Sequence, residues 1–248
     1  LSPNALAIED EAETQPDDLP AETAVVVYSL DELQAAISAA DDGDTITLGD
    51  RINITENCVI GDAEKQITIV PLDETINIYF SIYGDTSNSI VFQNIILDGM
   101  GYPCSAAIDV NKYNTGEIKT NLSLLNITVR NVLSDWIPMS LFATAAKIEN
   151  CHFENNNGKR AGAIWISEVS TVEMYQSTLC NNKSSSVGGA INCQGKLELT
   201  GCTIKGNEAA YEATGSYTGG GIQIESGAYC KMTSCTCLLY TSDAADEL

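Results

Sequence analysis

Apolar and polar residues alternate along many short segments of this chain with a period of two. Ala190-Ile191-Asn192-Cys193 is one such segment, and Leu197-Glu198-Leu199-Thr200 follows it after a polar break. This period predicts β-strands. Nearly continuous apolar runs lie upstream, at residues 90–97 and 122–129. Such runs are typical of strands that are buried in a parallel stack.

Two short motifs recur among these predicted strands. Gly-Ala-Ile or Gly-Gly-Ile stands at residues 162–164, 189–191 and 220–222. An apolar residue followed three positions later by Asn begins at Phe153, at Leu179 and at Ile204. Self-similarity at a regular spacing of this order indicates a solenoid in which each repeat contacts only its neighbours. The segments are too short and too rich in Asn, Gly, Ser and Thr for intervening helices, which favours a parallel β-helix.

One helix is predicted, at the start of the strand pattern. Ser29-Leu30-Asp31-Glu32 forms a capping box, in which the Ser hydroxyl and the Glu carboxylate satisfy free amide donors. The predicted helix spans residues 30–40 and has Leu33, Ile37 and Ala40 on one face. An open end of a β-helix exposes unpaired strand edges and apolar core, so we expect this amphipathic helix to cover it.

The helix and the repeats resemble known families. Residues 29–37 (SLDELQAAI), followed by GDTITL at 43–48, resemble the N-terminal cap of the pectate-lyase-like right-handed β-helix superfamily. The paired Gly-Gly-Ala-Ile and Phe-x-x-Asn motifs resemble the repeats of polymorphic outer-membrane proteins, which are autotransporter adhesins. The resemblance covers residues 25–236. It implies an all-β, single-stranded right-handed parallel β-helix with an N-terminal amphipathic capping helix.

The two ends of the chain differ from this domain. Ala5-Leu6-Ala7 resembles a signal-peptidase site, and the acidic stretch up to residue 24 has no basic residue, so we expect a signal-peptide remnant and a disordered leader at 1–24. Residues 237–247 resemble a translated sequencing adapter. We therefore expect a metagenomic fragment whose β-helix is truncated after residue 236 and whose residues 237–248 are an artefactual tail.

Charge and hydropathy restrict the partners. The 248 residues carry a formal net charge of −22, so nucleic acid and anionic membranes are not expected partners. No apolar run approaches the roughly 20 residues of a membrane span. We expect a monomer that is secreted or displayed on the bacterial cell surface.

The cysteines predict neither a metal site nor a defined disulfide pattern. The chain has nine cysteines, no Cys-x-x-Cys pair and one histidine, His152, so no zinc site and no cofactor are expected. Cys151 and Cys202 share one position of the coil, and Cys235 continues the column. We predict an inward stack of free thiols. Disulfides remain an alternative if the protein is exported.

The resemblance raises an enzymatic alternative, because many members of the superfamily cleave acidic polysaccharides. Of the motifs of the polygalacturonan hydrolases, the Asp-Asp pair occurs only at the end of the predicted helix, His152 has no flanking Gly, and the other two are absent. A lyase needs an Arg or Lys base, for which Arg130, Lys159 and Arg160 are candidates, and calcium ligands, for which Asp98 and Asp109 are candidates. None lies in the Arg-x-Pro-x-x-Arg pattern of such lyases, and a negative surface disfavours a polyanionic substrate. We therefore predict no catalytic residue, with calcium-assisted lyase chemistry as the alternative.

Other residues are assigned from the repeat. Asn156, Asn182 and Asn207 are predicted to stack as an asparagine ladder that satisfies turn backbone. His152 is predicted to face outward from a strand. Trp165 follows Ile164 in strand register, so it is the predicted carbohydrate contact.

These inferences favour a non-catalytic, exported or cell-surface bacterial β-helix repeat protein that binds carbohydrate or host-surface ligands, as an adhesin does. A polysaccharide lyase or other carbohydrate-active enzyme of the same superfamily is the first alternative. A structural stalk that carries another domain is the second.

Overall fold

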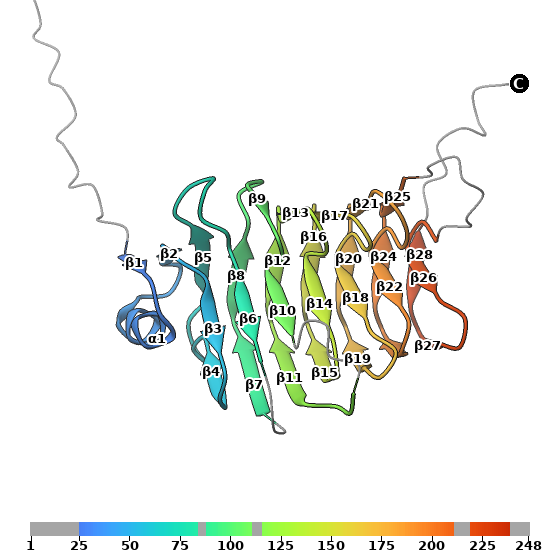
Figure 1. Ribbon diagram of the computed structural model, residues 1–248, viewed down its shortest axis with the longest axis horizontal. Helices are drawn as coiled ribbons and strands as arrows, with labels where there is room; N and C mark the ends of the chain where they lie inside the picture. Colours follow the sequence, from blue (N-terminus) through green and yellow to red (C-terminus); the bar gives the residue numbers. More distant parts are fainter. Residues whose placement is uncertain (1–24, 84–87, 111–115, 211–218, 239–248) are drawn as a thin grey trace, which may run out of the picture.

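The computed structural model describes residues 25–83, 88–110, 116–210 and 219–238. They form one elongated stack of coils whose strands all pair in parallel (Figure 1). The strands lie in four sheets, which we name A to D. The prediction of a parallel β-helix is confirmed by these sheets.

Sheets A and B have nine and seven strands within the described ranges. Sheet A contains β1 (Val25–Val27), β2 (Thr45–Leu48), β5 (Ile67–Pro71), β8 (Ile95–Asp98), β12 (Thr128–Arg130), β16 (His152–Glu154), β20 (Thr178–Cys180), β24 (Thr203–Lys205) and β28 (Thr236–Leu238). Sheet B contains β3 (Ile52–Ile54), β6 (Phe80–Ile82), β10 (Ile108–Val110), β14 (Met139–Leu141), β18 (Ile164–Ile166), β22 (Ile191–Cys193) and β26 (Ile222–Ile224).

Sheets C and D complete each turn of the stack, sheet C with the longest strands and sheet D with the shortest. Sheet C contains β4 (Cys58–Ile60), β7 (Asn88–Gln93), β11 (Thr120–Leu125), β15 (Thr144–Glu149), β19 (Thr171–Tyr175), β23 (Lys196–Thr200) and β27 (Tyr229–Thr233). Sheet D contains β9 (Pro103–Cys104), β13 (Leu133–Ser134), β17 (Asn157–Gly158), β21 (Lys183–Ser184) and β25 (Glu208–Ala209).

A full coil passes through sheets D, B, C and A in that order, as β13, β14, β15 and β16 do. Consecutive coils are in register, so that Thr128, His152, Thr178 and Thr203 stand side by side in sheet A. Each step along this row is one full turn of the stack. The sequence repeat is therefore one coil.

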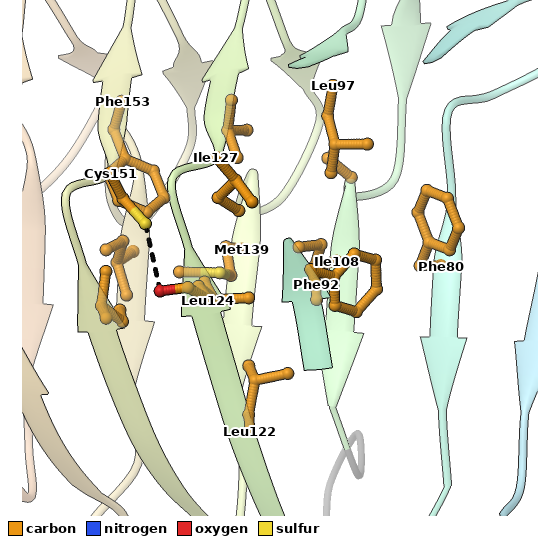
Figure 2. Packing of buried hydrophobic residues seen from close by; sticks show 14 of the residues in the cluster. Phe80, Phe92, Leu97, Ile108, Leu122, Leu124, Ile127, Met139, Cys151 and Phe153 are labelled. Carbon is orange, nitrogen blue, oxygen red and sulfur yellow. Dashed lines mark hydrogen bonds between the residues drawn. The ribbon is translucent and has the colours of Figure 1, made fainter. Parts of the chain in front are cut away.

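The inward side chains of all coils form one continuous apolar core. Phe80, Phe92 and Phe153 are the largest of its fully buried side chains. The rings of Phe80 and Phe92 meet edge to face with centroids 5.2 Å apart, and Leu97 and Ile108 fill the interior beside them (Figure 2). Burial of such side chains is the main stabilising contribution to a fold of this kind.

Two columns of residues turn the chain sharply on either side of sheet A, each with a positive φ. Between sheets C and A the column consists of Asn94, Asn126, Asn150, Gln176, Gly201 and Ser234, with φ between 47° and 65°. After sheet A the column consists of Asn131, Asn155, Asn181 and Gly206. Asn and Gly are the residues that adopt this left-handed conformation most readily, which explains why the chain is rich in both.

The predicted helix is present as α1 (Leu30–Ala39), at the N-terminal end of the stack (Figure 1). The Ser29 hydroxyl accepts from the Glu32 amide at 3.2 Å, and the Glu32 carboxylate accepts from the Tyr28 amide at 2.7 Å. Leu33 and Ile37 are buried against the core. The Lys65 ammonium donates to the Ala40 carbonyl at 2.8 Å, at the other end of the helix. This helix is too short to cross a membrane, and no other helix occurs among the described residues.

Candidate ligand-binding face

The outward face of sheet C is exposed, and it carries both charged and aromatic side chains. Its outward charged residues in β15, β19, β23 and β27 are three lysines and three glutamates: Lys147, Lys196, Lys231, Glu149, Glu173 and Glu198. They alternate along the strands with buried residues such as Ala146 and Ile148. The face is therefore balanced in charge, although the whole chain is strongly negative.

Most of these side chains are held in pairs. Lys147 Nζ lies 2.9 Å from Glu149 Oε2, and Lys196 Nζ lies 2.7 Å from Glu198 Oε1. The hydrogen bond from Lys147 to Glu149 raises the pKa of the lysine above its ordinary value. The Tyr175 hydroxyl donates to Glu173 at 2.9 Å, and this hydrogen bond raises the pKa of the tyrosine. These groups present fixed donors and acceptors on the surface.

A depression of about 390 Å³ opens beside Tyr175, at the edge of sheet C. It exists because Gly201 lacks a side chain in a column where its neighbours are Gln176 and Ser234. A Cβ atom added to Gly201 would come no closer than 3.7 Å to another atom, the Cγ of Gln176. The missing side chain thus leaves space in the depression that Tyr175 also lines, and Lys147 Nζ lies 5.8 Å from the centroid of the Tyr175 ring.

A second depression, of about 290 Å³, lies on the same face and is lined by Asn121, Ser123, Thr171 and Glu173. Lys147 borders both depressions. The two hollows are therefore neighbours that follow the sheet across several coils, as an extended ligand would require. We call the outward surface of β11, β15, β19, β23 and β27, together with the turn residue Gly201, the sheet C face.

The structure places the candidate base Arg130 on the outward side of sheet A, in an ion pair. Its Nε lies 2.7 Å from Oδ2 of Asp98, on the neighbouring coil. Asp98 also accepts from Asn131 Nδ2 at 3.0 Å and from the Met100 amide at 2.9 Å. Burial raises the pKa of Asp98, but these hydrogen bonds and the Arg130 charge outweigh it and hold the pKa below its ordinary value. Both groups are thus engaged with each other.

The other lyase candidates lie elsewhere. Lys159 and Arg160 follow β17 in sheet D, where both amides bond to the carbonyl of Trp136 and the Arg160 guanidinium lies 5.3 Å from the centre of the Trp136 ring. Asp109 points outward from sheet B but is only 3% exposed, and it accepts from Tyr79 and Ser140. The candidate calcium ligands Asp98 and Asp109 therefore stand on two different sheets.

The prediction that Trp165 is an exposed carbohydrate contact needs correction. It points out of the main core, as its register with Ile164 indicates, yet its side chain is only 5% exposed. The ring packs against Phe142, with centroids 4.4 Å apart, and against Ile137 and Ala161. An exposed sugar-stacking surface at Trp165 is therefore absent, because neighbouring side chains cover this part of sheet B. Its Nε1 has no hydrogen-bond partner among the described residues.

The three repeated asparagines stack directly on one another inside the turn after sheet A. The Nδ2 of Asn156 donates to Asn182 Oδ1 at 3.0 Å, and the Nδ2 of Asn182 donates to Asn207 Oδ1 at 2.9 Å. Each Nδ2 also donates to a carbonyl of the preceding coil, such as Phe153 O for Asn182. These amides are fully used within the fold and are not free for a ligand.

Cys151 and Cys202 are buried, unpaired and inward, with Ser177 between them in the column. The Cys151 thiol donates to the Leu124 carbonyl at 3.3 Å (Figure 2). Burial raises the pKa of the Cys151 thiol to about 11. It therefore remains protonated near neutral pH and is unreactive.

The sequence analysis did not single out Tyr175 and Gly201 as a site. The signal that could have found them is the column of left-handed turn residues, in which a glycine interrupts a series of larger polar residues. The motifs fix the coil register between residues 153 and 207, so they bring the two residues to neighbouring coils, but register alone does not show that the surface is hollow there.

No protein-family model matches the chain, and no curated protein matches it. Among solved structures, the chain is similar to a mutant of the PL6 family alginate lyase AlyGC, with a TM-score of 0.27 and 10% sequence identity. The match covers 86% of this chain and 40% of that chain. This chain thus spans less than half the length of that lyase.

Proposed function

We propose that this protein is a non-catalytic, exported or cell-surface β-helix repeat protein that binds a neutral polysaccharide on the sheet C face. The observation that carries the proposal is the open depression beside Tyr175, bordered by paired polar side chains. An aromatic ring next to fixed hydrogen-bonding groups suits a sugar, which has an apolar ring face and a rim of hydroxyls. Ala5-Leu6-Ala7, which resembles a signal-peptidase site, supports export.

The arrangement favours an extended ligand. Neighbouring strands in a sheet are about 4.8 Å apart, so two hollows that span several coils are matched by more than one sugar unit. Charge favours a neutral polymer, because the sheet C face carries equal numbers of lysines and glutamates while the chain as a whole repels polyanions.

The proposal is tested by affinity electrophoresis of the full chain through gels that contain neutral glucans, mannans or arabinans. We expect retardation by at least one of them. Tyr175→Ala should weaken binding about tenfold, which corresponds to about 1.4 kcal/mol. Gly201→Asn should weaken it too, because Asn tolerates the left-handed φ of 65° and its side chain would fill the depression. Tyr83→Ala, which truncates a tyrosine that is 48% exposed on another coil, is the matched control.

Binding that survives both Tyr175→Ala and Gly201→Asn would refute the sheet C face as the site. Release of unsaturated, ultraviolet-absorbing products would instead show a polysaccharide lyase. If the protein neither binds nor cleaves any neutral or acidic polysaccharide, the result would favour a structural stalk.

A further inference from the structure

Three metal-ligating side chains converge on the outward side of sheet A, away from the sheet C face. His152 and Glu154 are alternate residues of β16 and so point to the same side, and Cys180 stands opposite Glu154 on the next strand, β20. The Nε2 of His152 lies 3.1 Å from Oε2 of Glu154 and 3.5 Å from Sγ of Cys180. All three ligand atoms lie within 4.8 Å of one another.

Hydrogen bonds satisfy this cluster only weakly. Both contacts use the same ring nitrogen, Nε2 of His152. If this nitrogen carries a proton, it donates to Glu154, and the Cys180 sulfur is only a weak acceptor for the same proton. If it carries a lone pair, it can accept from the thiol but faces the carboxylate without a proton between them. A cation at the centre would satisfy nitrogen, oxygen and sulfur at once.

The distances suit a tetrahedral ion. Zinc binds His nitrogen and carboxylate oxygen at about 2.0–2.2 Å and Cys sulfur at about 2.3 Å, so its ligand atoms are separated by about 3.3–3.8 Å. The separations of His152 Nε2 from its two partners, 3.1 and 3.5 Å, lie close to this range, and the third pair, Glu154 and Cys180, lies within 4.8 Å. Mixed nitrogen, oxygen and sulfur donors favour zinc over calcium or magnesium, which prefer oxygen alone.

We propose that His152, Glu154 and Cys180 bind one divalent zinc ion with a fourth coordination position open to solvent. The side chains of His152 and Glu154 are 40% and 27% exposed, so an ion can enter from water, while Cys180 lies deeper. Binding replaces the thiol proton, which is released to solvent as the sulfur–zinc bond forms. The carboxylate and the resulting thiolate then balance the double positive charge of zinc.

The charged neighbours are compatible with this site. Arg130 stands opposite Glu154 on the preceding coil, but its Nε is held by Asp98 at 2.7 Å. Burial and the Glu154 charge raise the pKa of the Cys180 thiol, and Lys205, which stands opposite Cys180 on the following coil, partly offsets them. The sequence predicted no zinc site, because its one histidine and Cys180 stand on different coils and meet only when the coils stack.

The test uses the full chain, without a histidine tag, labelled with ¹⁵N-histidine. The chain contains one histidine, so NMR of its ring nitrogens reports on His152 alone. One equivalent of zinc should shift the Nε2 resonance strongly, and titration calorimetry should give one ion per chain. Cobalt should produce a thiolate charge-transfer absorption. Cys180→Ser and Glu154→Gln should each weaken zinc binding at least tenfold, whereas Cys58→Ser, which changes a half-buried cysteine of β4, should leave it unchanged.

An unshifted His152 resonance in excess zinc would overturn the proposal, and this result does not depend on any variant folding. Zinc binding that is equally tight in Cys180→Ser and Glu154→Gln would also overturn it. Circular dichroism of each variant establishes that the β-helix is intact.

Discussion

The asparagine ladder shows how a single residue can hold three coils together. Asn182 is fully buried and lies between Asn156 and Asn207. Its Oδ1 accepts from the amide and the Nδ2 of Asn156, and its Nδ2 donates to Phe153 O and Asn207 Oδ1. Every polar atom of the side chain is therefore paired, which removes the penalty of burying it.

Asn182→Ala should lower the free energy of unfolding by about 2–4 kcal/mol, because it leaves buried donors and acceptors of both neighbouring coils without partners. Asn182→Asp keeps the shape but replaces the donor by an acceptor facing two others, so it should destabilise as well. Asn121→Ala, on the exposed side of sheet C, is the control, and urea denaturation measures all three variants. If Asn182→Ala changed stability as little as an ordinary surface substitution does, by less than about 0.5 kcal/mol, the ladder would not have this role.

For single residues, the sequence predicts the role of those that recur in every repeat better than the role of those that do not recur. The stacking of Asn156, Asn182 and Asn207 follows from a repeat that can be read directly, since each recurs at one coil length. The burial of Trp165 does not follow from the sequence. Period-two alternation predicts the side of the strand to which the residue points, but not whether other side chains cover that side. Asp109 and Asn192 also point out of sheet B and are buried.

Among the elements, the short helix α1 both covers the core and contacts the end of a sheet. It covers the N-terminal end of the core with Leu33 and Ile37, and its Gln34 side chain donates to the Val59 carbonyl of β4 at 3.4 Å. The helix thereby shields apolar surface and also binds a carbonyl of a strand that ends its sheet.

Leu33→Ala should lower the free energy of unfolding by about 2–5 kcal/mol, because it leaves a cavity where a fully buried side chain stood. Ser29→Ala should lower the free energy of unfolding by about 1 kcal/mol, because it removes the N-cap. Ser38→Ala, at an exposed position of the same helix, should change stability by less than about 0.5 kcal/mol. Equal stabilities of Leu33→Ala and Ser38→Ala in thermal unfolding would show that the helix does not cover the core.

The whole molecule is a one-dimensional stack, so its stability is distributed by nearest-neighbour contacts. Coils in the middle have neighbours on both sides. The last described coil has only one, and its inward residues Ile224 and Met232 are 37% and 42% exposed. The two ends of the described stack therefore differ, since α1 covers only the first.

Hydrogen exchange should reveal this gradient. We expect amides of β14, β15 and β16 to exchange slowest, and amides of β26, β27 and β28 to exchange at least tenfold faster, because opening the last described coil disrupts contacts with one neighbour only. Mass spectrometry of peptides from each coil measures the rates. Uniform protection from β5 to β28 would indicate a single cooperative unit instead.

Much of the architecture could be predicted from the sequence because it repeats. The two candidate sites do not repeat, and they were not predicted. Register, turn residues and the capping helix follow from motifs such as Phe153-x-x-Asn156 and Ser29-x-x-Glu32. Tyr175 with Gly201, and His152 with Cys180, become neighbours only across coils. The repeat at Phe153, Leu179 and Ile204 sets these coils in register, but it does not show which outward side chains converge or where the surface is hollow.

The covered first coil has a consequence for self-assembly. A free strand edge is a template onto which a strand of another molecule can add. The helix α1 contacts β1, β2 and β3 and buries Leu33 and Ile37, so a second stack cannot continue the apolar core at this end. In the language of polymer chemistry, α1 is a chain terminator, because it removes one of the two growing points that an unlimited fibre of coils needs.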